Sequence, residues 1–87
     1  MFITYILQLA KSGRFYIGHT EHIAKRLLRH NSGEVTATKN KGPWIVVYKE
    51  SFETRSQAVE RELEVKSKKS RKYIEALIIG TATHIPT

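Results

Sequence analysis

The sequence predicts a small α/β fold, in which a three-stranded, mainly antiparallel sheet is flanked by three helices. Three observations predict it. Two strand-like segments are separated by a short turn, a third follows Pro43, and three stretches repeat apolar residues at helical spacing. The chain has 87 residues and no cysteine, so one core must hold by apolar packing, without disulfides or thiolate–zinc sites.

The first two strands are expected to form a hairpin. Residues 2–9 are a nearly continuous apolar run, which is typical of a strand buried on both faces. Residues 11–13 supply a turn that ends in a glycine, and residues 14–18 return as the second strand. Alternation along the two strands then places Tyr5 and Tyr16 on the same face of the sheet.

The first helix is expected to follow directly and to end near residue 31. Thr20 is placed as its N-cap, and Gly33 as its stop. Its apolar stripe contains Ile23, Ala24, Leu27 and Leu28. His22, Arg26 and His30 recur four residues apart, so they are expected to line one flank beside that stripe.

The second half of the chain predicts a strand and two helices. After a polar loop over residues 34–42, a strand is expected over residues 44–51. Thr54 and Gln57 have the spacing of a capping box, which starts a helix that runs to about residue 66. Glu62 falls on or beside the apolar stripe of that helix, which is formed by Ala58, Val59, Leu63 and Val65.

The last helix is expected over residues 69–79. Its inward face is formed by Tyr73, Ile74, Leu77 and Ile78. A single domain over residues 1–79 is therefore predicted, followed by a flexible tail over residues 80–87.

The composition narrows the class of protein. The net charge of +7 and the pI near 9.9 fit a polyanionic partner, and they equally fit simple solubility. No segment approaches the ~18 consecutive apolar residues of a membrane span. The N-terminal segment has the pattern of a strand rather than of a signal peptide, so a cytoplasmic location is expected.

The most informative motif is Tyr16-Ile17-Gly18. It comes eleven residues after Tyr5, and Arg26 and Glu62 follow it on two different helices. This ordered set resembles the GIY-YIG nuclease superfamily, and most closely its small stand-alone, excinuclease C-subunit-like branch. The resemblance extends from about residue 2 to residue 78. It includes several further short motifs: His30-Asn31-Ser32-Gly33, Gly42-Pro43-Trp44, Tyr48, Ala58-Val59-Glu60-Arg61-Glu62 and Lys66.

The resemblance implies a metal-dependent endonuclease that hydrolyses DNA phosphodiester bonds in DNA repair or processing and selects structure rather than sequence. Glu62 would be the ligand of Mg²⁺ or Mn²⁺, since Mg²⁺ keeps several waters and needs few carboxylates. Tyr16 would be the general base, and Arg26 would stabilise charge on the phosphate. Tyr5 would orient phosphate or water. His30 would bind phosphate, shuttle a proton or cap its helix.

Structural roles compete with these assignments. Glu62 has the spacing for an i,i+4 ion pair with Lys66, Tyr16 is a favourable strand residue, and Tyr5 suits the core. The chain also departs from the family's first triad, because Ile3 and Thr4 stand where the family has glycine and isoleucine. A non-catalytic nucleic-acid-binding module on the same scaffold is therefore the rival interpretation.

Two basic clusters are candidates for contacts with phosphates. The first cluster, in the loop, consists of Lys39 and Lys41. The second, around the last helix, consists of Lys66, Lys68, Lys69, Arg71 and Lys72. A run of like charge is also usual on a solvated face. The expected partner is a nucleic acid, with DNA favoured over RNA, and a protein partner or a homodimer is left open.

Overall fold

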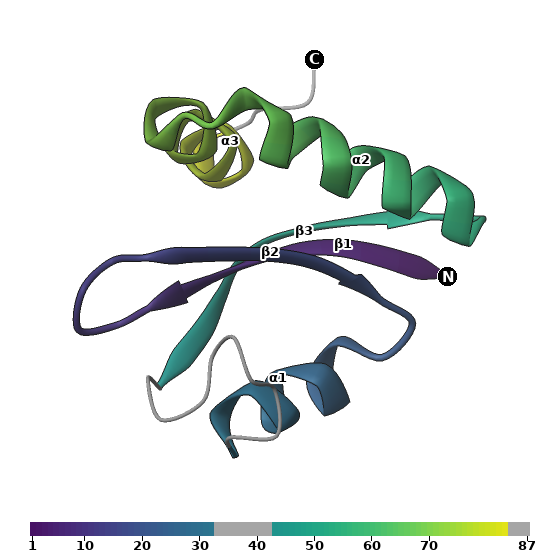
Figure 1. Cartoon of the computed structure of the whole chain (residues 1–87), viewed down its shortest axis with the longest axis horizontal. Helices are drawn as coiled ribbons and strands as arrows, with labels where there is room; N and C mark the ends of the chain where they lie inside the picture. Colours follow the sequence, from purple (N-terminus) through teal and green to yellow (C-terminus); the bar gives the residue numbers. More distant parts are fainter. Residues whose placement is uncertain (33–42, 84–87) are drawn as a thin grey trace.

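The computed structural model describes residues 1–32 and 43–83. The elements in chain order are β1 (Phe2–Leu9), β2 (Phe15–Thr20), α1 (Ile23–Asn31), β3 (Trp44–Phe52), α2 (Arg55–Lys68) and α3 (Arg71–Thr83). Three antiparallel strands and three helices confirm the predicted α/β architecture. Figure 1 shows α2 and α3 on one face of the sheet and α1 on the other.

The sheet has the order β2-β1-β3, so β1 is its central strand. This explains the nearly continuous apolar run of β1, because both of its faces are covered by helices. In the β1–β2 pair, Tyr5 lies opposite Gly18 and Leu7 lies opposite Tyr16. The two tyrosines therefore share a face, as alternation along the strands predicts.

Each face of the sheet has its own apolar core. On the α1 side, the buried residues are Tyr5, Leu7, Leu9 and Trp44. On the α2 and α3 side, they are Ile6, Val65 and Ile74, and the four predicted inward residues of α3 belong to this cluster. The buried hydroxyl of Thr4 donates to the Ala58 carbonyl at 2.8 Å, which joins β1 to α2 without leaving a polar group unpaired.

The predicted start of α1 and its predicted buried face are wrong in detail. Thr20 ends β2, and its hydroxyl accepts the His22 N–H at 3.1 Å, while His22 itself occupies the N-cap position. Leu28 is 69% exposed and Ala24 is exposed, whereas His30 is 1% exposed. The short helix is rotated so that positions 23, 27 and 30 face the sheet, because His30 finds a hydrogen-bonding partner there.

The capping box that starts α2 is confirmed in both directions. The Thr54 hydroxyl accepts the Gln57 N–H, and the Gln57 side chain accepts the Thr54 N–H, each at 3.2 Å. The helix ends at Lys68, followed by Lys69 in the left-handed region with φ of 48°. Leu63 is 58% exposed, so its prediction as part of the buried stripe is wrong.

Helix α3 extends to Thr83, four residues beyond its predicted end, so the segment predicted as a tail begins as helix. In the part of the chain that the structure describes, no helix combines the length and the apolar character that crossing a membrane requires.

Candidate active site

A hollow of about 200 Å³ lies beside the end of β2 that leads into α1. Its lining residues are Tyr5, Tyr16, Gly18, His19, Arg26, Arg55 and Glu62. Four of the five predicted catalytic residues meet here, from β1, β2, α1 and α2. Because β2 is an edge strand, residues from both faces of the sheet can reach one hollow around it.

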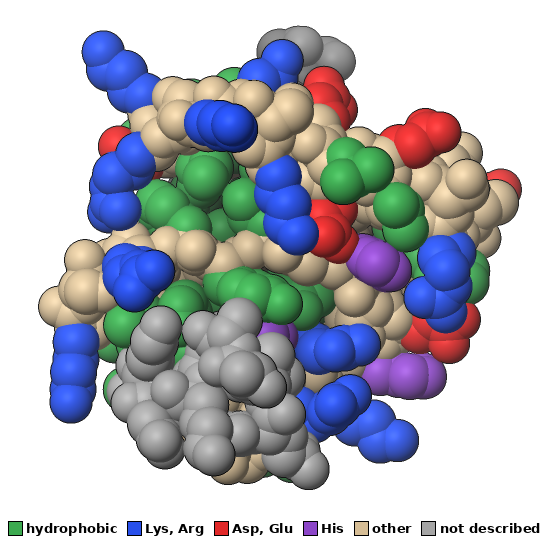
Figure 2. Space-filling model, viewed as in Figure 1, with side chains coloured by type: hydrophobic (Ala, Val, Ile, Leu, Met, Phe, Trp, Pro, Cys, Tyr) green, Lys and Arg blue, Asp and Glu red, His purple; other side chains and the backbone are tan. Residues whose placement is uncertain are grey.

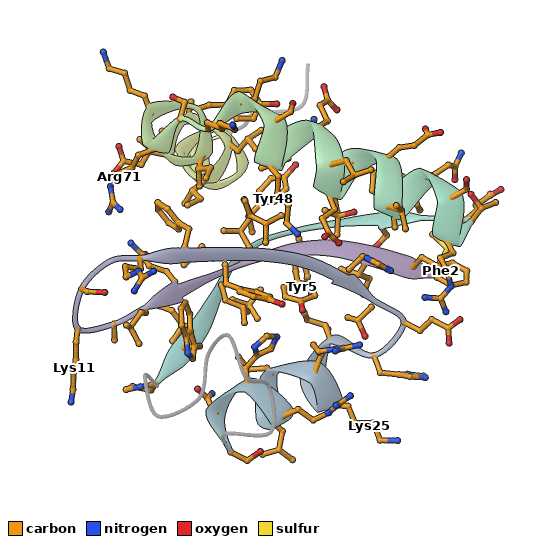
Figure 3. The ribbon with its side chains drawn as sticks, in the orientation of Figure 1. Phe2, Tyr5, Lys11, Lys25, Tyr48 and Arg71 are labelled. Atoms are coloured by element: carbon orange, nitrogen blue, oxygen red, sulfur yellow. The ribbon has the colours of Figure 1, made fainter. Side chains whose placement is uncertain are left out.

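The glycine of the Tyr-Ile-Gly motif makes room for the first tyrosine. A Cβ atom added to Gly18 would lie 2.6 Å from the Tyr5 hydroxyl and 2.8 Å from the ring carbon that bears it. The phenol of Tyr5 therefore crosses directly over the backbone of β2. It lies on the α1 side of the sheet, where its hydroxyl is 3.1 Å from Nε2 of His30 (Figure 3).

The His30 ring packs against the rings of both Tyr5 and Tyr16. Its ring centroid is 4.7 Å from that of Tyr16 and 6.1 Å from that of Tyr5, each in an edge-on arrangement. With 1% of its surface exposed, His30 does not line the hollow. Its geometry is that of a residue that positions the two phenols, rather than one that meets a phosphate from solvent.

The buried side chains of Tyr5 and His30 are both held in their neutral forms. Burial raises the pKa of Tyr5, and the neighbouring Tyr16 adds to the increase. Burial lowers the pKa of His30, and the positive charges of Arg26 and Arg29 lower it further. The Tyr5 phenol is thus a hydrogen-bonding group rather than a base.

We expect the neutral His30 to make the fold sensitive to mild acid. Its pKa in the folded state lies below the ~6.5 of an unfolded chain, so below that pH the unfolded state binds more protons and stability falls. Thermal unfolding followed by circular dichroism should show a melting temperature that decreases from pH 7 to pH 5. The decrease should shrink in His30→Gln and persist in His22→Gln, whose side chain is 71% exposed. An equal decrease in both variants would contradict this assignment.

Glu62 is the acid of the hollow, and its side chain is 15% exposed. Its two oxygens are each 2.6 Å from a side-chain nitrogen, Oε1 from His19 Nδ1 and Oε2 from Lys66 Nζ. Burial by itself would raise the pKa of Glu62, but the hydrogen bonds from Lys66 and His19 outweigh it and hold the pKa below its usual range. Glu62 therefore both forms the predicted i,i+4 pair with Lys66 and lines the hollow.

This carboxylate fits a hard divalent cation. An ionised carboxylate offers about four lone-pair directions, and two of those of Glu62 are used by His19 and Lys66. Mg²⁺ binds through one or two carboxylates and retains several waters. Among the described residues no three or more His, Cys, Asp or Glu side chains gather to hold a metal, so a cation in the hollow would rest on Glu62 and its own waters.

Arg26 also lines the hollow, from α1, and its side chain is partly buried. Of the carboxylates in residues 1–32 and 43–80, none lies within ion-pair distance of its guanidinium. Its donors therefore remain available to an anion in the hollow.

Two residues of the hollow were not predicted from the sequence, His19 and Arg55. His19 points to the opposite face of β2 from Tyr16 by strand alternation, which separates it from the tyrosines in any sequence pattern. Its one signal was its place directly after Gly18. The signal for Arg55 was a cation at the first position of a helix, where acidic residues are usual.

The structure describes the second of the predicted basic clusters, and none of its members lines the hollow. Lys39 and Lys41 fall outside the described residues. In the second cluster Lys66 pairs with Glu62, while Lys68, Lys69 and Lys72 are exposed near the junction of α2 and α3. Figure 2 shows Lys and Arg side chains spread over this face of the molecule, with acidic side chains gathered over α2.

Arg71 has a structural role in the same cluster. Its guanidinium donates to the Gly13 carbonyl at 3.0 Å, lies 4.7 Å from the Phe15 ring centroid and pairs with Glu75 at 3.1 Å. It thus fastens the start of α3 to the β1–β2 turn, at the end of the molecule where Figure 3 labels Arg71 and Lys11.

Comparison with known proteins identifies the family of the chain. Residues 1–74 match the model of the GIY-YIG catalytic domain. The chain therefore belongs to the GIY-YIG nuclease family, and Tyr5 and Tyr16 of its two tyrosine motifs both line the hollow. Within it, the similar curated proteins are small stand-alone members named UPF0213.

Two of these relatives illustrate the extent of the match. A UPF0213 protein of Staphylococcus saprophyticus is 37% identical over 71 residues, which are 80% of this chain and 87% of that protein. One of Bacillus pumilus is 38% identical over 85 residues, 92% of this chain and 86% of that protein. The solution NMR structure of a UPF0213 protein from Bacillus halodurans is 34% identical, covers 90% of this chain and 83% of that chain, and superposes with a TM-score of 0.56.

Proposed function

We propose that the protein is a metal-dependent endonuclease that hydrolyses DNA phosphodiester bonds, with Mg²⁺ or Mn²⁺ held by Glu62. The observation that supports it most is the hollow, in which two phenols, a guanidinium and an ionised carboxylate converge from four elements. Membership of a nuclease family agrees with this chemistry.

The residues divide the work of hydrolysis. Tyr16, as the general base, takes the proton of the attacking water. Arg26 donates to phosphate oxygens as negative charge develops on them. Tyr5, held protonated, orients phosphate or water, and His30 keeps both tyrosines in place. Glu62 would hold the divalent cation, which would supply Lewis-acid stabilisation of the phosphate.

The substrate is selected by structure rather than by sequence. The exposed cations Lys68, Lys69 and Lys72, together with Lys39 and Lys41, suit contacts with the sugar–phosphate backbone, and such contacts read no bases. We therefore propose a role in DNA repair or processing in the cytoplasm, on DNA in preference to RNA. A protein partner or a second copy of the chain would enlarge the contact area of so small a domain.

A cleavage assay tests the proposal directly. End-labelled single-stranded, duplex, nicked and branched DNA, and matching RNA, would be incubated with the protein in Mn²⁺, Mg²⁺ or EDTA. We expect metal-dependent cutting of at least one branched or nicked DNA. Salt-sensitive binding without cutting of any substrate would favour the rival, a non-catalytic binding module.

One observation weakens that rival. Besides the small size of the chain, its motivation was the departure from the family's first triad at Ile3 and Thr4, yet neither residue lines the hollow. Thr4 instead joins β1 to α2 through its bond to Ala58 on the other face of the sheet. The departure from the family's first triad therefore affects residues that pack the scaffold and not residues that line the hollow.

We expect the two tyrosines to differ in their effect on the rate. Tyr16→Phe removes the proposed base and should lower single-turnover cleavage about 100-fold. Tyr5→Phe removes a phenol that stays protonated, so its loss should be smaller, about 10-fold, without a change in the pH profile of the rate. Cleavage rates of both variants, measured from pH 6 to pH 9, test which tyrosine is the base. A larger defect in Tyr5→Phe than in Tyr16→Phe would reverse the assignment.

A further inference from the structure

We propose that Arg55 is a second phosphate-binding residue of the hollow, and that it holds the phosphate next to the scissile one. The substrate would then be a strand with at least two consecutive phosphates rather than an isolated phosphodiester. This inference rests on the proposed nuclease function and deepens it. Arg55 and Arg26 line the same hollow from helices α2 and α1, which cover opposite faces of the sheet (Figure 1).

The charges of the hollow favour an anion larger than one phosphate. Among the described residues that line it, Glu62 is the sole acid, and it already accepts hydrogen bonds from His19 and Lys66. The guanidiniums of Arg26 and Arg55 therefore have no carboxylate partner among the described residues that line the hollow. Guanidinium is suited to phosphate because its planar set of donors matches two phosphate oxygens.

Arg55 has one aromatic contact and one weak ion pair, so a phosphate can take the place of its present acceptor. Its guanidinium carbon lies 4.9 Å from the Phe2 ring centroid, within the range of a cation–π contact. Its ion pair with Glu21 is long, 3.5 Å, and exposed on both sides, 58% for the arginine and 46% for the glutamate. Exposed pairs of this kind are weak, so a phosphate can displace Glu21.

The position of Arg55 in its helix points to the same role. It is the first residue of α2, and the first turn of this helix has no acidic residue. The helix dipole disfavours a cation there, so this arginine does not serve the stability of the helix. A residue that opposes the local preference and lines a functional hollow is expected to act on a ligand.

Binding in EDTA provides the first test, since it separates affinity from cutting. The dissociation constant for the preferred DNA substrate would be measured against KCl concentration for wild type, Arg55→Gln and Arg14→Gln. Arg14 is an exposed arginine at the other end of β2 and serves as the matched control. We expect Arg55→Gln to bind about 10-fold more weakly, with a log–log salt slope smaller by about 0.9, the value for one phosphate contact. Arg14→Gln should change affinity less.

A neutral substitution in the DNA provides the second test. Once the cut position is mapped, a methylphosphonate would replace the phosphate on one side or the other of it. Wild type should lose about 10-fold in cleavage at one of these positions, and Arg55→Gln should lose nothing more there. Equal losses in both proteins, or wild-type binding by Arg55→Gln, would overturn the role of Arg55 alone. Failure of wild type to bind or cut any substrate would instead overturn the proposed nuclease function.

Discussion

Replacement of Glu62 by glutamine is expected to abolish metal-stimulated cleavage while leaving the protein folded. The amide keeps the shape of the side chain and an oxygen that accepts from His19 or Lys66, so the local packing survives. It loses the charge that binds a divalent cation. Because a bound cation contributes several kcal/mol of transition-state stabilisation, single-turnover cleavage in Mg²⁺ should fall by about 10³-fold or more.

Glu60→Gln is the matched control for that experiment. Glu60 lies on the same helix, its side chain is exposed, and it does not line the hollow. This variant removes the same charge from the protein and should retain both cleavage and Mn²⁺ binding measured by calorimetry. If Glu62→Gln retained Mn²⁺ binding, or if both variants lost activity equally, Glu62 would not be the metal ligand.

Local patterns were sufficient to predict the elements that place the tyrosines. Strand alternation put Tyr5 and Tyr16 on one face, and the observed β1–β2 register does the same. The spacing of Thr54 and Gln57 predicted a capping box that is present in the structure. Both features depend on neighbours within one element or one hairpin, which is why a single sequence is enough to find them.

Tertiary partners decided the parts that the sequence did not predict. His30 was assigned to a flank of α1 by its spacing from His22 and Arg26, but its ring is buried, where the Tyr5 hydroxyl offers it a hydrogen bond. Likewise, the contact of His19 with Glu62 depends on how α2 lies across the edge of the sheet. No spacing along the chain encodes that angle, so residues 43 positions apart could not be paired in advance.

Gly18→Ala is expected to damage stability and activity together. The added Cβ would lie 2.6 Å from the Tyr5 hydroxyl, and the ring cannot simply move away because it is 2% exposed and packed in the α1-side core. Forcing an extra methyl group into such packing costs about 2–3 kcal/mol. For a domain of this size the melting temperature should fall by about 10–20 °C. The displaced phenol would also lose its place over β2, so cleavage should fall with it.

Two further variants separate a steric cause from a general loss of glycine. Gly80→Ala is the control, because nothing lies within 4 Å of a Cβ at that position and alanine favours the helix in which it sits. It should leave the melting temperature unchanged or slightly higher. The double variant Gly18→Ala with Tyr5→Phe removes the atom in closest conflict, so part of the lost stability should return while the cleavage defect remains. A Gly18→Ala protein that melts and cuts like wild type would show that the tyrosine can shift freely, and the tight crossing of Tyr5 over β2 would then have no part in building the site.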